Sequence, residues 1–222
     1  MTPLHGHLPS PGVLLVLVLA RLLRPRRRIT AHWHCFLDSN RDLNGFLFSI
    51  YQWLALRLLP CFTAVVTTSP LLAEELQRCG CCQNSIFVLP CCLSQKQEHM
   101  GLALHVPVAR AGEPLRIVFI GRLDSYKRLD WLFDALAQLS ISWKLVVVGD
   151  GPKRSLFEQL AYRDFDFASS VRFVGRLSES AKFEQIAAAD LLVLPSSCSN
   201  EAFGIVQLEA MAAGRIALAF DQ

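Results

Sequence analysis

Leu115-Arg-Ile-Val-Phe-Ile-Gly121 is an apolar run closed by a glycine, which is typical of a β-strand buried on both faces. From 129 to 139, apolar residues recur at helical spacing. The alternation continues with expected strands at 144–148, 171–174, 191–194 and 216–220, and expected helices from Pro152 to about Tyr162, at 179–189 and after Gly204. Strands and helices interleaved in this way predict an α/β fold with a doubly wound parallel sheet.

The first half is also of α/β type, although its pattern is less regular. Helices are expected at 13–23, 46–59 and 70–78, and strands at 29–32, 61–67 and 86–89. The polar segment 94–113 is interrupted by Gly101, Pro107 and Gly112, which predicts a linker. We therefore expect two Rossmann-like domains, 1–93 and 114–222, joined by that linker.

The charge of the chain is uneven. With 222 residues that are 52% hydrophobic, the chain can bury a large core. Residues 114–222 carry 12 basic and 13 acidic side chains, so the net charge of +3 comes from the first half, where Arg21–Arg28 contains five arginines. The apolar run Val13–Ala20 precedes them, and it is too short to span a bilayer and has the wrong polarity for a signal peptide. Two interpretations remain: a helix with a basic C-terminal end, or peripheral contact with an anionic membrane.

Composition limits the partners and the compartment. Eight cysteines without an export signal indicate reduced thiols and a cytoplasmic protein, peripheral at the inner face of the membrane if the arginines bind lipid. The cluster Cys79–Cys92 lacks paired C-x-x-C spacing and contains no histidine, so we expect no metal. We also expect no nucleic-acid partner.

Two glutamates mark a candidate site near the end of the chain. Glu201 follows turn residues, the helix expected to open at Phe203 and Gly204 offers free amides, and Glu209 lies two turns later. A ligand with both hydroxyls and phosphates would suit this arrangement. The alternative is an ordinary amphipathic helix with acidic residues near its start.

Other polar residues fall where expected strands end, which is where ligands bind in parallel sheets. They are Arg122, Lys127, Gly149 and Ser196. Arg122 and Lys127 offer a guanidinium fork and a point charge, a combination suited to phosphate, unless both are merely solvated loop residues. Gly149-Asp-Gly151 lacks the third glycine of the dinucleotide fingerprint, which makes a Rossmann oxidoreductase a weaker reading.

Taken together, the second half resembles the retaining glycosyltransferases of GT-B fold, family 4. The resemblance is carried in order by Gly121-Arg-Leu…Lys127-Arg128, Val148-Gly-Asp-Gly-Pro152, Val171-Arg-Phe-Val-Gly175, Ala189-Asp-Leu-Leu-Val-Leu-Pro-Ser196 and Glu201-Ala-Phe-Gly-Ile…Leu-Glu-Ala-Met-Ala-Ala-Gly214. It implies a nucleotide-sugar donor whose diphosphate is neutralised by Arg122 and Lys127 in place of a metal. It further implies that Glu201 faces the transferred sugar, that Gly204 and Ile205 offer amides, and that Glu209 holds the ribose. No cofactor is implied.

The first half resembles the later part of the acceptor domain in the same family. Leu4-His-Gly-His-Leu-Pro-Ser-Pro11 is similar to a family loop, and Thr30-Ala-His-Trp-His34 to a strand end that carries a site histidine. His34 is the candidate for that catalytic histidine, with a hydrogen-bonded structural role as the alternative. His32 is the weaker candidate, and His5 and His7 are either site or loop residues. Relative to the family, the chain looks truncated at both ends.

The expected function is therefore hexosyl transfer, with retention, from a UDP- or GDP-sugar to a glycan or lipid-linked acceptor in cell-surface polysaccharide or glycolipid synthesis. The alternative is a non-catalytic nucleotide-sugar-binding fragment of such an enzyme.

Overall fold

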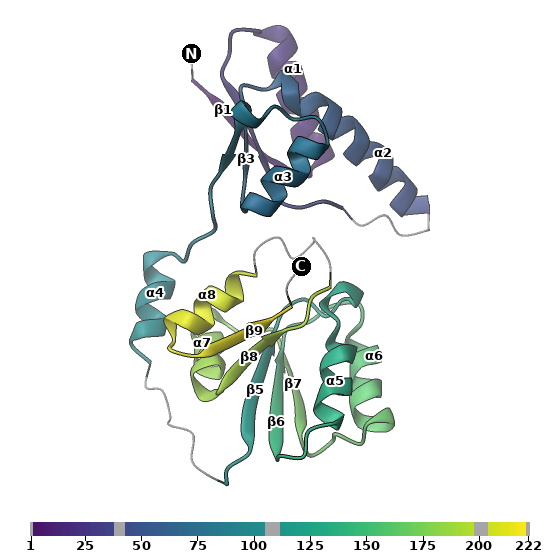
Figure 1. The fold of residues 1–222 in the computed structure, drawn as a ribbon, viewed down its shortest axis with the longest axis vertical. Coiled ribbons are helices and arrows are strands. Elements are labelled where there is room, and N and C mark those ends of the chain that lie inside the picture. The colour runs from purple at the N-terminus through teal and green to yellow at the C-terminus, as the bar shows by residue number, and fades with distance from the viewer. Residues whose placement is uncertain (1, 38–42, 105–111, 198–203, 221–222) are drawn as a thin grey trace. The chain divides into compact units, whose positions relative to one another are not determined.

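The computed structural model describes residues 2–37, 43–104, 112–197 and 204–220. The chain forms two compact units, each built on a parallel sheet, and the break between them follows Cys91 (Figure 1). The predicted α/β fold with two Rossmann-like domains is confirmed.

The N-terminal unit is a parallel sheet with the strand order β1-β2-β3-β4. Its elements are β1 (Leu4–Leu8), α1 (Pro11–Leu23), β2 (Ile29–Trp33), α2 (Leu43–Leu58), β3 (Ala64–Thr67), α3 (Pro70–Arg78) and β4 (Ile86–Val88). Its core joins Leu17 of α1 and Leu76 of α3 to Trp33, all fully buried. Two expectations were wrong here. Residues 4–8, expected as a loop, form a strand because they pair along their whole length with β2, and β3 begins later than expected because Leu59–Cys61 is a short 3₁₀ helix.

The segment 94–113, expected as a linker, contains the helix α4 (Gln95–Leu102). A capping box opens it: the Gln97 amide donates to Ser94 Oγ (3.3 Å), and the Ser94 amide donates to Gln97 Oε1 (3.1 Å). Gly101 lies where a Cβ atom would come within 3.0 Å of the Ala212 backbone. The glycine thus permits close helix packing, and α4 belongs to the C-terminal unit.

The C-terminal unit is a five-stranded parallel sheet with helices on both faces (Figure 1). Its remaining elements are β5 (Leu115–Ile120), α5 (Leu129–Ala137), β6 (Trp143–Val148), α6 (Arg154–Gln159) continued by a π-helix at Leu160–Asp164, β7 (Val171–Gly175), α7 (Glu179–Ala188), β8 (Leu191–Leu194), α8 (Ile205–Ala212) and β9 (Ile216–Ala219). Phe133 of α5 and Phe157 of α6 pack on one face, and Ile186 of α7 and Ala210 of α8 pack on the other. The predicted alternation of strands and helices is confirmed.

The strand order β7-β6-β5-β8-β9 places a topological switch point at β5. The chain leaves β5 toward β6 on one side and later returns to β8 on the other, so the loops after these strands diverge and leave a crevice. Backbone hydrogen bonds hold these loops: Ser197 N–H donates to Tyr126 O (2.9 Å), and Leu123 N–H donates to Asp150 O (3.1 Å). The loops at the carboxyl ends of the strands are therefore held in place by backbone hydrogen bonds.

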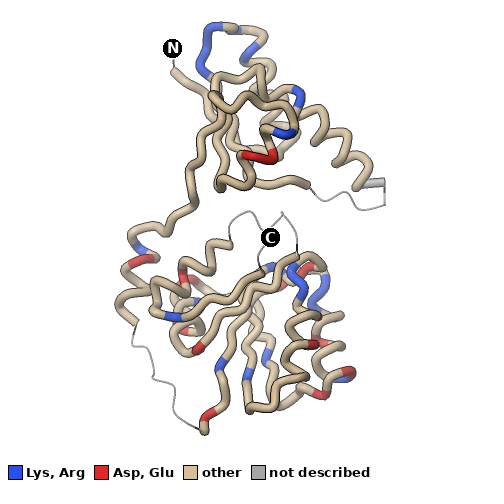
Figure 2. Tube along the Cα trace, viewed as in Figure 1, with Lys and Arg blue, Asp and Glu red and all other residues tan. Residues whose placement is uncertain are grey.

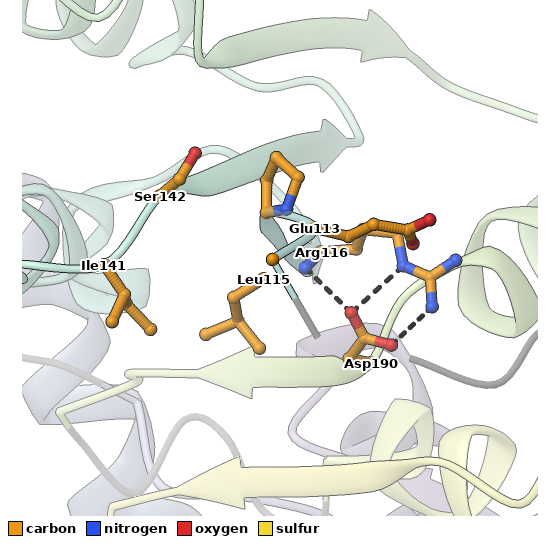
Figure 3. A pocket seen from close by; sticks show the side chains of 8 residues that line it. Glu113, Leu115, Arg116, Ile141, Ser142 and Asp190 are labelled. Atoms are coloured by element: carbon orange, nitrogen blue, oxygen red, sulfur yellow. Dashed lines mark hydrogen bonds and ion pairs between the residues drawn. The ribbon is translucent and has the colours of Figure 1, made fainter. Parts of the chain in front are cut away.

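At the amino ends of the strands, an ion pair joins Arg116 and Asp190 (Figure 3). Asp190 accepts from Arg116 Nη2 (2.6 Å), Arg116 Nε (3.0 Å) and the Arg116 amide (2.9 Å). The hydrogen bonds from Arg116 hold the pKa of Asp190 below its usual range. A pocket of about 440 Å³ lies beside this pair, at the amino ends of β5 and β6. Because guanidinium and carboxylate satisfy each other, the pair ties β5 to the start of β8.

Candidate functional site

A pocket of about 340 Å³ opens at the carboxyl ends of the C-terminal sheet. It is lined by Ile120, Gly121, Arg122, Val148, Gly149, Asp150, Arg176, Leu177 and Lys182. Arg122 follows β5, Arg176 follows β7, and Lys182 comes from α7. Three cationic side chains and two glycines thus line the pocket at the carboxyl ends of the strands, where parallel sheets bind ligands. The positive charge favours an anionic ligand.

Close contact between two strand ends forms part of the pocket. Gly149 has φ +133°, and a Cβ atom there would lie 1.9 Å from the carbonyl oxygen of Gly121. No side chain fits at that distance. Gly149, a weak indication in the sequence by itself, is thus explained by its close packing against Gly121.

The two predicted phosphate-binding cations both lie at the end of β5, but in different surroundings. Arg122 is exposed, with its Nε 3.3 Å from Asp124 Oδ2. Lys127 ends a 3₁₀ helix at Ser125–Lys127 and is buried, and a Cβ atom at Gly121 would lie 3.4 Å from its Nζ. Both cations therefore flank the Gly121 turn, and their role toward phosphate stays a prediction.

Arg128, the next basic residue along the chain, is engaged elsewhere. Its Nη2 lies 2.7 Å from Asp130 Oδ2, and its guanidinium stacks 3.6 Å from the centre of the Trp131 ring. The Arg128 side chain therefore binds residues in the first turn of α5.

Glu209 is almost completely buried in α8, at 1% exposure. Its Oε1 accepts from Lys182 Nζ (2.8 Å) and from Gln97 Nε2 (3.1 Å). Its Oε2 is buried and has no hydrogen-bond partner in the described part of the chain. Since Lys182 also lines the pocket, the carboxylate is connected to it through one side chain.

Sequence reasoning missed both partners of Glu209. Lys182 bonds Glu179 as well (2.9 Å), and in sequence that spacing indicates only a surface ion pair on one helix. Burial opposes the charge of Lys182, but its hydrogen bonds to Glu209 and Glu179 outweigh burial and raise its pKa. Gln97 was not identified because residues 94–113 were expected to be a linker, although Ser94-x-x-Gln97 matches the capping-box pattern of a helix start.

The helix start near the glutamates differs from the prediction. Gly204 is the N-cap of α8 with φ +65°, and the helix begins at Ile205. A Cβ atom at residue 204 would lie 2.4 Å from Gln207 Nε2 and 2.8 Å from Leu194 Cδ2, so a larger residue would have to displace both side chains and adopt a strained φ. Phe203 and Glu201 lie outside the described residues, and the predicted sugar-facing role of Glu201 stays a prediction.

The candidate histidine, His34, lies just beyond β2 in the N-terminal unit. Its amide donates to Leu8 O (2.9 Å), which extends the pairing of β1 and β2. Its Nε2 lies 2.7 Å from His7 Nδ1. Burial and the neighbouring His7 and His5 lower its pKa. Strand pairing thus joins histidines that the sequence showed only as separate motifs.

The arginine-rich segment forms the connection between α1 and β2 (Figure 2). Arg21 braces this connection by donating to Pro25 O (2.7 Å) and Arg27 O (3.2 Å). Three arginines of the connection are exposed: Arg24, Arg26 and Arg28. No helix in the described part of the chain has the length and apolarity needed to cross a membrane.

Comparison with known proteins assigns the C-terminal unit. Residues 114–222 match the family model of the glycosyl transferases group 1. This part of the chain is therefore similar in sequence to glycosyltransferases of that group. An uncharacterized glycosyltransferase of Methanocaldococcus jannaschii is 37% identical over 100 residues, which cover 44% of this chain and 25% of that protein. The phosphatidyl-myo-inositol mannosyltransferase of Mycolicibacterium smegmatis is 33% identical over 109 residues, covering 47% of this chain and 27% of the mannosyltransferase.

The structural comparison extends over both units. The Anabaena protein Alr3699/HepE, solved with UDP and glucose, superposes with a TM-score of 0.72 at 20% identity, covering 97% of this chain and 58% of that one. The chain thus has the GT-B fold. It spans little more than half of this structural neighbour, and its matches to the curated relatives span about a quarter of their length.

Proposed function

We propose that the protein transfers a hexosyl group, with retention, from a UDP- or GDP-sugar to a glycan or lipid-linked acceptor in cell-surface polysaccharide or glycolipid synthesis. The observation that carries the proposal is the glycine-lined pocket with Arg122, Arg176 and Lys182 at the carboxyl edge of the glycosyltransferase domain. The UDP bound to the Anabaena neighbour and the phosphatidylinositol acceptor in the name of the mycobacterial relative support these donor and acceptor classes.

The chemistry needs stabilisation of a leaving group. Transfer of the sugar builds negative charge on the departing nucleoside diphosphate, and fixed cations lower the barrier when they bind that charge more strongly in the transition state. Arg122 and Lys127 are the proposed diphosphate ligands, with the amides of Gly204 and Ile205 beside them. No cofactor has a role in this scheme.

The remaining assignments concern the sugar and the ribose. Glu201 is proposed to face the transferred sugar, and His34 to act from the acceptor side. Glu209 is proposed to bind the ribose, as the family resemblance implies, and its carboxylate is joined to the pocket through Lys182.

Replacing a diphosphate ligand should weaken nucleotide binding. For Lys127→Ala we expect the affinity for UDP or GDP to fall about 10- to 100-fold, as for the loss of a charge-assisted hydrogen bond. Because Lys127 is buried, the exposed Arg122→Ala variant should show the same direction without a folding defect. Isothermal titration calorimetry measures both, and Lys144→Ala, an exposed lysine on β6, is the matched control. Unchanged affinity in both variants would remove the diphosphate assignment.

Turnover separates the enzyme from a binding protein. Wild type should release nucleotide from a UDP- or GDP-sugar in the presence of acceptor extract, and Glu201→Ala should abolish that release. Nucleotide binding without any turnover would favour the non-catalytic nucleotide-sugar-binding alternative. Binding of NAD in place of UDP or GDP would indicate an oxidoreductase.

We further propose that the α1–β2 connection contacts anionic lipid at the inner face of the cytoplasmic membrane. The exposed arginines adjoin Leu19, Leu22 and Leu23 of α1, which are themselves exposed. Replacing Arg24, Arg26 and Arg28 together by alanine should lower binding to phosphatidylserine vesicles about 100-fold, at about 1 kcal/mol per charge. Sedimentation with anionic and neutral vesicles tests this, with Arg163→Ala/Arg172→Ala as control. Equal sedimentation of the triple variant and wild type would refute the contact.

A further inference from the structure

Four histidines converge on one face of the N-terminal sheet. β1 and β2 pair in parallel with His7 opposite His32 and His5 opposite Thr30. Because side chains alternate along a strand, His5 and His7 share a face with His32 and His34. Residues that alternate with them along the two strands, among them Leu8, Ala31 and Trp33, are buried in the core. The alternation of a strand pair, and not proximity in sequence, assembles the cluster.

The ring nitrogens of three of these histidines are close enough to share one ion. One nitrogen each from His5, His7 and His32 lies within 4.8 Å of the other two. In tetrahedral zinc sites with Zn–N bonds of about 2.0–2.1 Å, neighbouring ligand nitrogens are about 3.3 Å apart. Small rotations of His5 and His7, which are exposed, would close that gap.

Outer hydrogen bonds already orient two of the rings. His5 Nδ1 lies 2.6 Å from Thr30 Oγ1, and His7 Nδ1 lies 2.7 Å from His34 Nε2. Metal-binding histidines commonly engage the second ring nitrogen in such a bond, which fixes the tautomer and leaves the other nitrogen for the metal. In both rings the nitrogen left over is Nε2.

His32 supplies an independent indication of a ligand. It is only 9% exposed, and its Nε2 is buried without a hydrogen-bond partner in the described part of the chain. Buried polar atoms normally have a partner, and an orphan calls for an unseen water or ion. Imidazole binds a metal through a ring nitrogen with a free lone pair, and the buried Nε2 of His32 has that capacity.

We propose that His5, His7 and His32 form a binding site for a divalent transition metal, with Zn²⁺ as the best match, and that His34 positions His7 through their hydrogen bond. Imidazole ligands suit Zn²⁺, Cu²⁺ and Ni²⁺, whereas Mg²⁺ and Ca²⁺ require oxygen ligands. Three protein ligands leave a fourth position for water or an anion. The site lies within the N-terminal unit and does not depend on the proposed donor site.

Zinc titration of the full chain tests the site. The exposed thiols are first alkylated with iodoacetamide, so that cysteines cannot bind the metal. Calorimetry with ZnCl₂ should then show one Zn²⁺ per chain. His5→Gln and His7→Gln should each lower the affinity more than 100-fold, and His34→Gln should lower it about 10- to 100-fold, as expected for an outer partner. His99→Gln, an exposed histidine of α4, is the matched control and should bind like wild type.

The test relies on variants of the exposed His5 and His7, because replacing the nearly buried His32 can disturb folding. Absence of binding by the alkylated wild type overturns the proposal, as does binding that survives both His5→Gln and His7→Gln in variants with unchanged circular dichroism. Wild-type affinity in His34→Gln overturns its positioning role. As a second measurement, Co²⁺ should give the visible absorption of a tetrahedral nitrogen site, and His7→Gln should abolish it.

Discussion

Gly149→Ala should destabilise the C-terminal unit by about 2–6 kcal/mol, a large part of the stability of a typical domain. The added Cβ atom would lie 1.9 Å from the carbonyl oxygen of Gly121, at a residue with φ +133°. Forcing the two strand ends apart costs about 1–3 kcal/mol for overpacking, and the strained backbone conformation costs about 1–3 kcal/mol more. Since both glycines line the basic pocket, nucleotide binding should fall with stability.

A matched glycine separates these two costs. Gly112 also has a positive φ, +88°, but a Cβ atom there would meet nothing within 4 Å. Gly112→Ala should therefore cost only about 1–2 kcal/mol, the penalty of the backbone conformation. Native-state hydrogen exchange of peptides from β5 and β6, measured in the full chain, reports the stability of this unit directly. Equal protection in the two variants would show that the contact between Gly121 and Gly149 yields easily.

The architecture of the second half was predictable because its signals are local. Each buried strand is an apolar run ended by glycine or polar residues, and each helix shows its own period. Predictions failed where tertiary contacts decide. Gly101 looked like a helix breaker, yet it allows α4 to pack against Ala212. Residues 4–8 were expected as a loop from the resemblance to a family loop, but their pairing with β2 makes them a strand.

In the candidate site, too, some residues could be found from local sequence and others only from tertiary contacts. The position of Arg122 and Lys127 after β5 could be inferred from sequence because both follow an apolar strand closely, whereas their role toward phosphate stays a prediction. Lys182 could not be found in this way, since nothing local distinguishes a lysine that reaches a buried carboxylate 27 residues away from one in solvent. The histidine cluster likewise needs the register of β1 on β2, which no motif encodes.

Lys182→Met should destabilise the C-terminal unit by about 3 kcal/mol. The side chain is 14% exposed and bonds Glu209, which is 1% exposed. Removing one partner of a buried pair leaves an uncompensated charge, at a cost of about 3–5 kcal/mol, and Gln97 still offers Glu209 one hydrogen bond. Glu179→Gln, which removes the other and exposed partner of Lys182, should cost less than about 1 kcal/mol. The double variant Lys182→Met/Glu209→Met should recover most of the loss, because an apolar pair can replace a buried ion pair.

The pH dependence gives this prediction a second test. The hydrogen bonds to Glu209 and Glu179 raise the pKa of Lys182 despite its burial, so the charge contributes its full stabilisation below the pKa of the unfolded chain. That contribution is lost only as the pH rises through the higher, folded-state pKa. The difference between wild type and Lys182→Met should therefore be constant from about pH 6 to pH 9. Hydrogen exchange of β5 and β6 across this range measures it. A difference that vanishes, or a double variant less stable than Lys182→Met, would mean that Glu209 is not held by Lys182.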